Sequence, residues 1–274
     1  MNFKFIVSIS ALLASQVAIA TDWPRFLGPN GNGLVKNDPQ LRLDWKTNPP
    51  KTAWTYQAGK GCSSFAISNG KVLTLGNQDG QDTLWCLDTL NGDLIWKHSY
   101  DEPLAAKYYT GGSSSTPTID GKHVYSVSKS GKLFCLDLDS GNVLWQKDYV
   151  KDFNGRKGGW GWAASPVVSD DLLFIDPGAK DGALVALDKK TGDLKWKAGN
   201  DEPGYATPIL YEHEGRKSLA LFHKKGLVGY SLKRPGDTNF RFSWRTSYGA
   251  NASNPHYHNG TFYISSGYGS GYAV

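Results

Sequence analysis

Short stretches in which apolar and polar residues alternate recur along most of the chain. Between His123 and Ser128, for example, successive side chains alternate with a period of two. This period predicts β-strands with one buried face. Five such stretches are each expected to form two strands, and four of them contain a turn-forming pair: Asn69-Gly70, Asp120-Gly121, Asp170-Asp171 and Asn259-Gly260. The pattern predicts an all-β chain in which no helix lies between the strands of one repeat.

A second pattern repeats downstream of three of these stretches. Residues 84–97, 133–146 and 184–197 each contain an aspartate, a glycine four positions later and a tryptophan eight positions later. The aspartates lie 49 and 51 positions apart, at 88, 137 and 188. Such a period indicates a repeat architecture in which each unit has four strands, A to D. The matched residues are Asp88, Gly92 and Trp96; Asp137, Gly141 and Trp145; and Asp188, Gly192 and Trp196.

The three repeated residue types suit structural roles. An aspartate after strand C can accept backbone N–H groups of the C–D turn, and the glycine takes the positive-φ position of that turn. The tryptophan on strand D is expected to fill the wedge between neighbouring units. Cys86, Cys135 and Ala186 share one register, which favours a small buried position over a redox pair.

Four-stranded units stacked radially form a β-propeller. The Asp–Gly–Trp spacing resembles the tryptophan-docking motif of pyrroloquinoline-quinone (PQQ) dehydrogenases and their non-enzymatic relatives, over residues 54–274. The segment 22–30 is similar to the leader of exported bacterial members of this family. The resemblance implies about five repeats of a propeller with about seven or eight blades. A short propeller that closes with about five blades is the alternative.

The later repeats depart from the pattern. In the fourth, Lys233–Asp237 makes a longer turn before Trp244. The fifth is expected to end within strand C, with Ala273 in the register of Ala186. Near the N-terminus, residues 51–57 resemble a lone strand D. We therefore expect a leader segment at 21–50 and a propeller at 51–274 that is incomplete at its C-terminus.

Residues 1–20 have the features of a secretory signal peptide. Lys4 is followed by the apolar run Phe5–Leu13, and Ala18-Ile19-Ala20 forms a cleavage box, so cleavage is expected after Ala20. A membrane anchor is the weaker alternative, because the apolar run is short and interrupted by polar residues. The prediction is a periplasmic or secreted protein with no stable membrane insertion.

Composition excludes some classes of function. The 30 basic and 25 acidic residues give a net charge of +5, and the lysines are spread among turns, so no nucleic-acid partner is expected. The three cysteines, Cys62, Cys86 and Cys135, are an odd number and do not form a disulfide framework.

If a ligand binds, the D–A loops at the mouth of the channel are the expected place. Trp160 and Trp162 can stack on a flat ligand or on a partner's side chain, or can simply pack against adjacent blades. The other candidates for ligand contact are Ser64, Ser114, Tyr205 and Asn251. His256 and His258 alternate on one strand, but no third metal ligand is evident, so neither a catalytic nor a metal residue is assigned.

The resemblance leaves two hypotheses of function. PQQ dehydrogenases hold PQQ and calcium at the channel mouth, beside a disulfide between adjacent cysteines, and no two cysteines are adjacent here. This favours a non-catalytic scaffold that binds a protein partner and needs no cofactor. The alternative is a PQQ- and calcium-dependent dehydrogenase of an alcohol or a sugar. The oligomeric state is not indicated.

Overall fold

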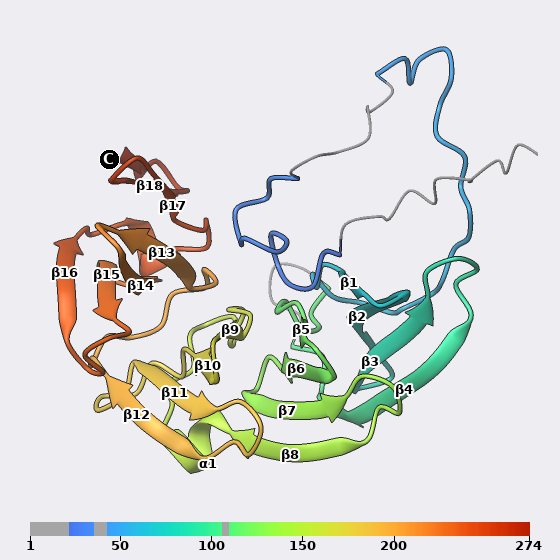
Figure 1. The fold of residues 1–274 in the computed structure, drawn as a ribbon, viewed down its shortest axis with the longest axis horizontal. Coiled ribbons are helices and arrows are strands. Elements are labelled where there is room, and N and C mark those ends of the chain that lie inside the picture. Colours follow the sequence, from blue (N-terminus) through green and yellow to red (C-terminus); the bar gives the residue numbers. More distant parts are fainter. Residues whose placement is uncertain (1–21, 36–42, 106–109) are drawn as a thin grey trace, which may run out of the picture.

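The computed structural model describes residues 22–35, 43–105 and 110–274, and its fold is a β-propeller. Four sheets have four antiparallel strands and the fifth has three. In Figure 1 they follow one another along an arc, and in the first four the first strand lies near the centre and the last at the rim. The predicted all-β architecture of four-stranded antiparallel blades is confirmed. The signal-peptide prediction falls on residues outside those described.

Each sheet is a meander of consecutive strands, which we call blades 1 to 5. Blade 1 contains β1 (Ala66–Ser68), β2 (Lys71–Gln78), β3 (Gln81–Asp88) and β4 (Leu94–Asp101). Blade 2 contains β5 (Thr118–Asp120), β6 (His123–Val127), β7 (Lys132–Asp137) and β8 (Val143–Asp148). Blade 3 contains β9 (Val167–Ser169), β10 (Leu172–Ile175), β11 (Leu184–Asp188) and β12 (Leu194–Ala198). Blade 4 contains β13 (Ile209–His213), β14 (Arg216–His223), β15 (Gly226–Ser231) and β16 (Thr238–Ser243). Blade 5 contains β17 (His256–His258), β18 (Thr261–Ser266) and β19 (Gly271–Ala273).

In the described residues two short helices lie between blades, and none lies between the strands of one blade, as the sequence predicted. The helix α1 (Tyr149–Phe153) follows β8, because Asp148 caps it by accepting hydrogen bonds from the N–H groups of Val150 and Lys151 at 2.9 and 3.0 Å. A 3₁₀ turn (Ser247–Gly249) follows β16. Among the described residues, neither helix has the length and apolar character needed to cross a bilayer.

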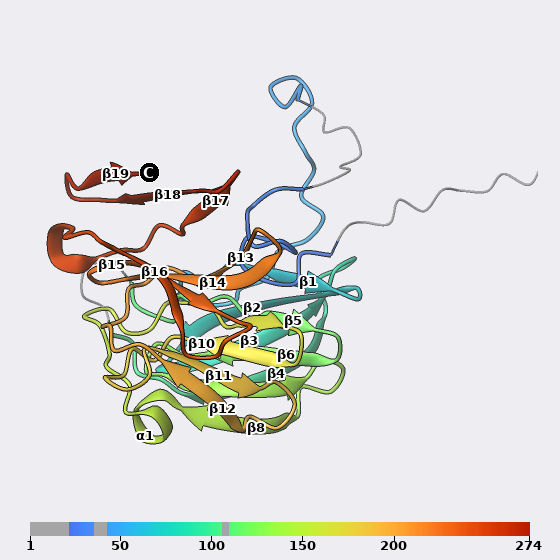
Figure 2. The same ribbon diagram turned by 60° about the vertical axis from the view of Figure 1, so that its left-hand side comes forward.

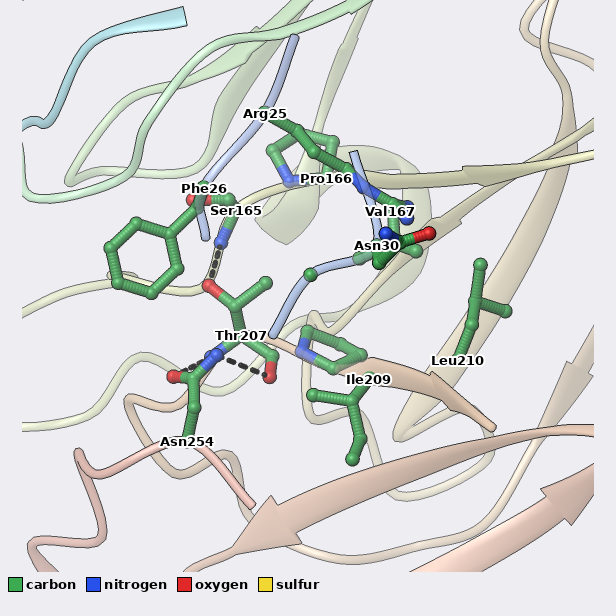
Figure 3. Close-up of a pocket in the computed structure, with 12 residues that line it drawn as sticks. Arg25, Phe26, Asn30, Ser165, Pro166, Val167, Thr207, Ile209, Leu210 and Asn254 are labelled. Atoms are coloured by element: carbon green, nitrogen blue, oxygen red, sulfur yellow. Dashed lines mark hydrogen bonds between the residues drawn. The ribbon is translucent and has the colours of Figure 1, made fainter. Parts of the chain in front are cut away.

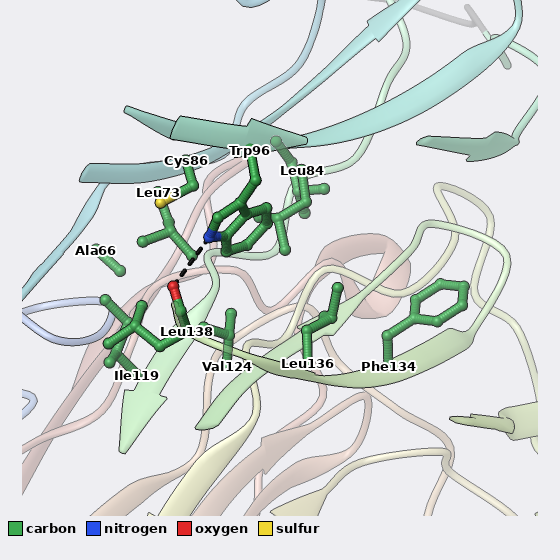
Figure 4. Packing of buried hydrophobic residues seen from close by; sticks show 11 residues of the cluster. Ala66, Leu73, Leu84, Cys86, Trp96, Ile119, Val124, Phe134, Leu136 and Leu138 are labelled. Atoms are coloured by element: carbon green, nitrogen blue, oxygen red, sulfur yellow. Dashed lines mark hydrogen bonds between the residues drawn. The ribbon is translucent and has the colours of Figure 1, made fainter. Parts of the chain in front are cut away.

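The repeated tryptophan joins blade 1 to blade 2 and blade 2 to blade 3. Trp96 on β4 donates a hydrogen bond from Nε1 to the carbonyl of Leu138 at 2.9 Å, as Figure 4 shows. A Cβ on Gly141 would lie 2.6 Å from the Trp96 ring, so only glycine permits this approach. Trp145 lies in the same way on Gly192, with its Nε1 3.3 Å from the carbonyl of Lys189.

Residues 51–59 form no strand ladder, yet Trp54 occupies the position of a strand-D tryptophan. Its Nε1 donates to the carbonyl of Thr89 at 3.0 Å, and its ring lies on Gly92. The segment at 51–57 therefore contacts blade 1 as the outer strand of a preceding blade would.

The turn after strand C is held by the repeated aspartate. Asp137 accepts hydrogen bonds from the N–H and the hydroxyl of Ser140, both at 2.8 Å, and these bonds lower the pKa of Asp137. Asp88 and Asp188 accept from the N–H groups of Leu90 and Lys190 at 2.7 and 2.9 Å. The three repeat glycines have φ between +72° and +75°.

In blade 4 a phenylalanine replaces the tryptophan. Gly229 pairs with Phe240, as Ala186 pairs with Trp196. Trp244, which the sequence placed after the long turn, lies beyond β16 and stacks on Phe222 at 5.9 Å. No atom lies within 4 Å of a Cβ built on Gly236, so the Trp–Gly contact is lost between blades 3 and 4.

Two predictions of register were wrong by one residue. The A–B turn of blade 2 is at 121–122, because Asp120 pairs with His123. In blade 5, shown beside blade 4 in Figure 2, Ala273 pairs with Ile264. In blade 3, Ala186 pairs with Phe174, and the residue of blade 5 at the position of Phe174 is Tyr263. The residue opposite Tyr263 is Val274, so Val274 and not Ala273 has the register of Ala186.

Four hydrophobic clusters fill the spaces between adjacent blades. The cluster in Figure 4 combines Leu73 and Leu84 of blade 1 with Val124 and Leu136 of blade 2. Cys86 and Cys135 lie fully buried in the first two clusters, and burial raises the pKa of each thiol to about 12. Both cysteines are free, which fits a packing role.

Candidate functional site

A relay of hydrogen bonds joins the five loops that enter the innermost strands. The N–H of Ser64 donates to Oγ1 of Thr116, and the N–H of Thr116 to Oγ of Ser165, at 3.1 and 2.8 Å. The N–H of Ser165 donates to Oγ1 of Thr207, and the N–H of Thr207 to Oδ1 of Asn254, at 3.0 and 3.2 Å. Each residue stands two positions before its strand A. The relay fixes the D–A loops in a row around the channel.

Two adjoining cavities lie within this row of loops. The smaller, of about 430 Å³, is lined by residues of all five D–A loops and by Phe26. The larger, of about 850 Å³, extends from the loop before blade 3 to the 3₁₀ turn. Trp160, Tyr205 and Tyr268 line both. We call the lining of the larger cavity the mouth surface; it is formed by Arg156–Trp160, Glu202, Pro203, Tyr205, Lys224, Tyr248, Gly249 and Tyr268.

Four aromatic side chains of the mouth surface form two edge-to-face pairs. The rings of Trp160 and Tyr205 are 5.5 Å apart at 70°, and those of Tyr248 and Tyr268 are 5.5 Å apart at 84°. Tyr248 is 82% exposed and Tyr268 66% exposed. Both tyrosines have positive φ, at 60° and 56°. Bulky residues in this region are strained, and such strain concentrates at functional sites.

Three of the six sequence candidates meet at these cavities. Trp160 and Tyr205 line both, and Ser114 lines the smaller one. Trp162 does not: it is 2% exposed, packs on Tyr149 with ring centres 5.4 Å apart, and donates from Nε1 to the carbonyl of Pro177. For Trp162 the structure shows the packing alternative.

Ser64 and Asn251 lie outside the lining of both cavities. Ser64 belongs to the relay between the D–A loops. Asn251 is fully buried, donates from Nδ2 to the carbonyl of His223 at 2.7 Å and accepts from the hydroxyl of Thr246 at 2.7 Å. Its side chain ties the loop before blade 5 to the end of β14, so it holds the backbone in place.

The leader forms part of the channel wall. Trp23 and Ile67 of β1 exchange two backbone hydrogen bonds of 2.8 Å, and the N–H of Ile119 donates to the carbonyl of Pro24 at 2.7 Å. Figure 3 shows the following leader residues, including Phe26, against the inner strands of blades 3 and 4, with a cavity of only about 10 Å³ between them. The sequence marked this leader but gave it no position.

The mouth surface carries more positive than negative groups. Arg156, Lys157 and Lys224 line it, and Glu202 is its one acidic residue. Glu202 accepts from Nζ of Lys224 at 2.7 Å, and this bond lowers the pKa of Glu202. Nη2 of Arg156 donates to the carbonyl of Asn200 at 2.7 Å. The surface therefore has an excess of two positive charges.

A buried ionisable pair lies between blades 3 and 4, behind the mouth surface. His223 Nδ1 and Asp176 Oδ1 are 3.9 Å apart, and neither atom has a hydrogen-bond partner among the described residues. Burial, with a smaller effect of Asp201, raises the pKa of Asp176 to about 8, and burial lowers the pKa of His223 to about 4. Burial thus favours the neutral form of each group.

Other charged and titratable groups surround this pair. Arg241 binds Asp201 through two hydrogen bonds of 2.7 and 2.9 Å. Tyr230 lies 3.5 Å from Nε2 of His223, and the buried Tyr149 has its pKa raised by burial and by Asp176. The sequence analysis did not predict this pair. A signal was present, because Asp176 stands in the register of the apolar residues Leu75 and Val127 of the preceding blades.

The described residues do not fit the calcium ion of a PQQ dehydrogenase. Calcium takes six to eight oxygen ligands. In the part of the chain that the structure describes, no three His, Cys, Asp or Glu side chains converge, and the one acidic group of the mouth surface is bonded to Lys224. The rings of His256 and His258 stack at 6.5 Å without a third such ligand. We derive no chemical step through PQQ or calcium.

The comparison with protein families assigns the chain to a family. A family model described as outer membrane protein assembly factor BamB matches residues 20–157 and 80–274. The chain belongs to this family of PQQ-like β-propellers. The match covers every blade, so the resemblance of the repeats to PQQ-type propellers is confirmed.

Individual relatives match over parts of this PQQ-like propeller. A stretch of 65 residues, 24% of the chain, is 34% identical to methanol dehydrogenase [cytochrome c] subunit 1 of Methylorubrum extorquens, and equally so to that of Methylobacterium organophilum. The chain covers 10% of these relatives' length.

Two solved structures share the fold. BamB from Moraxella catarrhalis is 22% identical with a TM-score of 0.55, over 77% of this chain and 57% of that one. Quinohemoprotein alcohol dehydrogenase from Comamonas testosteroni is 14% identical with a TM-score of 0.64, over 89% of this chain and 46% of that one. The chain thus spans about half the length of these structures. At such identities the likeness shows the fold alone.

Proposed function

We propose that this protein is an exported, non-catalytic propeller that binds a protein partner through its mouth surface. The observation that carries the proposal is the set of exposed aromatic side chains on that surface. Aromatic residues and arginine are enriched where proteins bind each other. Tyr248 and Tyr268 gain little burial in the chain itself, so a partner is the source of burial that would offset their backbone strain.

The acid–base groups of the mouth surface also favour a scaffold over a dehydrogenase. Dehydrogenation with PQQ requires a base that accepts a proton from the substrate. Glu202 is the one carboxylate of the mouth surface, and Lys224 holds it with a depressed pKa, which makes it a weak base. The leader supports export, since its resemblance is to exported members of the family.

Photo-crosslinking of the full-length protein in its own cells tests the proposal. A benzophenone amino acid is placed at Trp160 or Tyr248, with Leu90 as the control because it is 86% exposed on a C–D turn outside both cavities. We expect one discrete crosslinked protein from positions 160 and 248 and none from position 90. Equal crosslinking at all three positions, or none at the mouth surface of folded protein, would contradict the proposal.

A titration with PQQ and Ca²⁺ tests the alternative dehydrogenase activity. Tryptophan fluorescence follows binding, because Trp160 lines both cavities, and reduction of a dye follows alcohol oxidation. The scaffold predicts neither saturable binding nor turnover. Saturable binding with turnover would overturn it in favour of a PQQ-dependent dehydrogenase.

A further inference from the structure

We propose that the segment bound by the mouth surface is an extended acidic peptide that carries an aromatic side chain. This inference rests on the proposed function and names the chemistry of the partner. It joins two independent observations, the excess positive charge of the larger cavity and the apolar lining of the smaller one.

The charge of the larger cavity selects the sign of the partner. Arg156, Lys157 and Lys224 face one acidic group, Glu202, so the surface attracts carboxylates and repels a basic segment. The bonds of Arg156 to the carbonyls of Gly178 and Asn200 hold its guanidinium group in place. A positioned guanidinium loses little freedom when it binds a carboxylate.

The smaller cavity selects an aromatic side chain. Its lining includes Phe26, Ala163, Ala250 and Ala252 beside the Trp160 ring, and no charged residue lines it. A volume of about 430 Å³ lies within the usual range of small ligand sites, about 300–1,000 Å³, and admits one aromatic group. Since the two cavities share Trp160, Tyr205 and Tyr268, a single extended segment reaches both.

The two strained tyrosines indicate how the segment is held. Tyr248 and Tyr268 stand at the edge of the larger cavity with exposed rings, and Gly249 and Gly269 beside them also have positive φ. Both rings remain largely exposed, at 82% and 66%. A peptide that passes along the mouth surface would bury them. Tyr248 therefore acts in binding, and within the chain its ring packs on that of Tyr268.

Binding of fluorescent peptides to the full-length protein tests the inference. The probe is an acetylated and amidated octapeptide of alternating Glu and Phe, and the matched peptides replace Glu by Lys or Phe by Ala. At physiological salt we expect the Glu–Phe peptide to bind at least about tenfold more tightly than either, with weaker binding at high salt because exposed charges are screened. Equal binding of the Lys–Phe peptide would overturn the inference.

Charge variants locate the effect. Lys224→Gln should weaken binding of the Glu–Phe peptide about two- to fivefold, whereas Glu202→Gln should strengthen it by a similar factor. Lys190→Gln makes the same charge change on an exposed turn outside both cavities and should leave affinity unchanged. Identical effects of Lys224→Gln and Lys190→Gln would show that net charge, not this surface, governs binding, and would contradict the inference.

Tyr248→Gly separates binding from folding. Because φ of Tyr248 is +60°, glycine relieves strain there and offsets the lost ring contact with Tyr268, so the variant should be about as stable as the natural protein. Peptide affinity should nevertheless fall about tenfold. A variant that keeps full affinity would overturn the role of Tyr248 and with it the inference.

Two further outcomes distinguish failure of the inference from failure of the proposed function. If PQQ displaces the peptide and supports alcohol oxidation, the proposed scaffold function fails as well. If the peptide does not bind but crosslinking at Trp160 and Tyr248 still yields one protein, the scaffold function stands and the acidic partner is wrong. Displacement of the peptide by a short oligothymidine at equal charge concentration would point to nucleic acid and overturn the inference.

Discussion

The backbone N–H of Ser165 donates a hydrogen bond to the hydroxyl oxygen of Thr207 at 3.0 Å, across the boundary between blades 3 and 4. Both residues are buried, and both stand two positions before the innermost strand of their blade. At this boundary the Trp–Gly contact is absent, since Trp196 faces no docking glycine. The relay bond thus provides a specific polar contact between two blades that lack the repeat contact.

Thr207→Val should destabilise the protein, because it removes the acceptor of the buried Ser165 N–H while keeping the side-chain shape. An unpaired buried N–H costs about 1–3 kcal/mol. Urea denaturation measures the change in the free energy of unfolding. Thr238→Val is the control, since Thr238 is exposed on β16 and the substitution is the same. Equal effects of the two substitutions would show that the relay bond does not stabilise the blade boundary.

Gly141→Ala should destabilise more than Gly121→Ala. Both glycines have positive φ, at +72° and +58°, so each substitution incurs the left-handed penalty of about 1–2 kcal/mol. At Gly141 the added Cβ also lies 2.6 Å from the Trp96 ring, and such overpacking costs about a further 1–3 kcal/mol. Nothing lies within 4 Å at Gly121. In a double-mutant cycle with Trp96→Ala, the additional loss of stability at Gly141 should vanish. If the additional loss persists, its origin lies outside the Trp96 ring.

Asp176→Asn should change how stability depends on pH. The pKa of Asp176 is raised from 3.8 to about 8 in the folded protein, chiefly by burial. Between these values the unfolded chain has lost the proton and the folded chain retains it, so the free energy of unfolding falls as pH rises through this window. The asparagine variant lacks this slope, and its advantage over the natural protein should grow from pH 4 to pH 8. Urea denaturation at several pH values measures it, and parallel curves would contradict the assignment.

His223→Gln should remove a slope of the opposite sign. Burial lowers the pKa of His223 from 6.5 to about 4, so the natural protein loses stability as pH falls from 6.5 to 4. The glutamine variant should lose less in this range. The pair of variants therefore separates the two groups, although they lie 3.9 Å apart.

Trp23→Ala should loosen the leader from the inner strands. The amides of Ile67 and Ile119 donate to carbonyls of Trp23 and Pro24, so their hydrogen exchange reports on this contact. If the ring contributes about 1.4 kcal/mol, exchange of both amides should accelerate about tenfold. Trp45→Ala is the control, because Trp45 is 57% exposed elsewhere in the leader. Unchanged protection of Ile67 would show that the leader does not depend on Trp23.

The sequence by itself determined the features that depend on neighbours along the chain. Strand alternation needs only a period of two, and the bonds of Asp137 to Ser140 close within one turn. The glycine at position 141 could be assigned its positive φ for the same reason. The spacing of Asp88, Gly92 and Trp96, repeated twice beside the alternating stretches, therefore predicted four-stranded blades, and its resemblance to a known motif indicated a propeller of PQQ type.

The tertiary structure decided the features that depend on residues one blade or more apart. Ser64 and Ser114 stand in loops of similar composition, and Trp160 and Trp162 stand in the same loop. Yet Ser64 belongs to the hydrogen-bond relay and Trp162 is buried in the core. Asp176 could have been noticed from its apolar equivalents, but its partner His223 lies 47 positions away. No local pattern records which side of a loop faces the channel, because that is set by the rotation of each blade against the next.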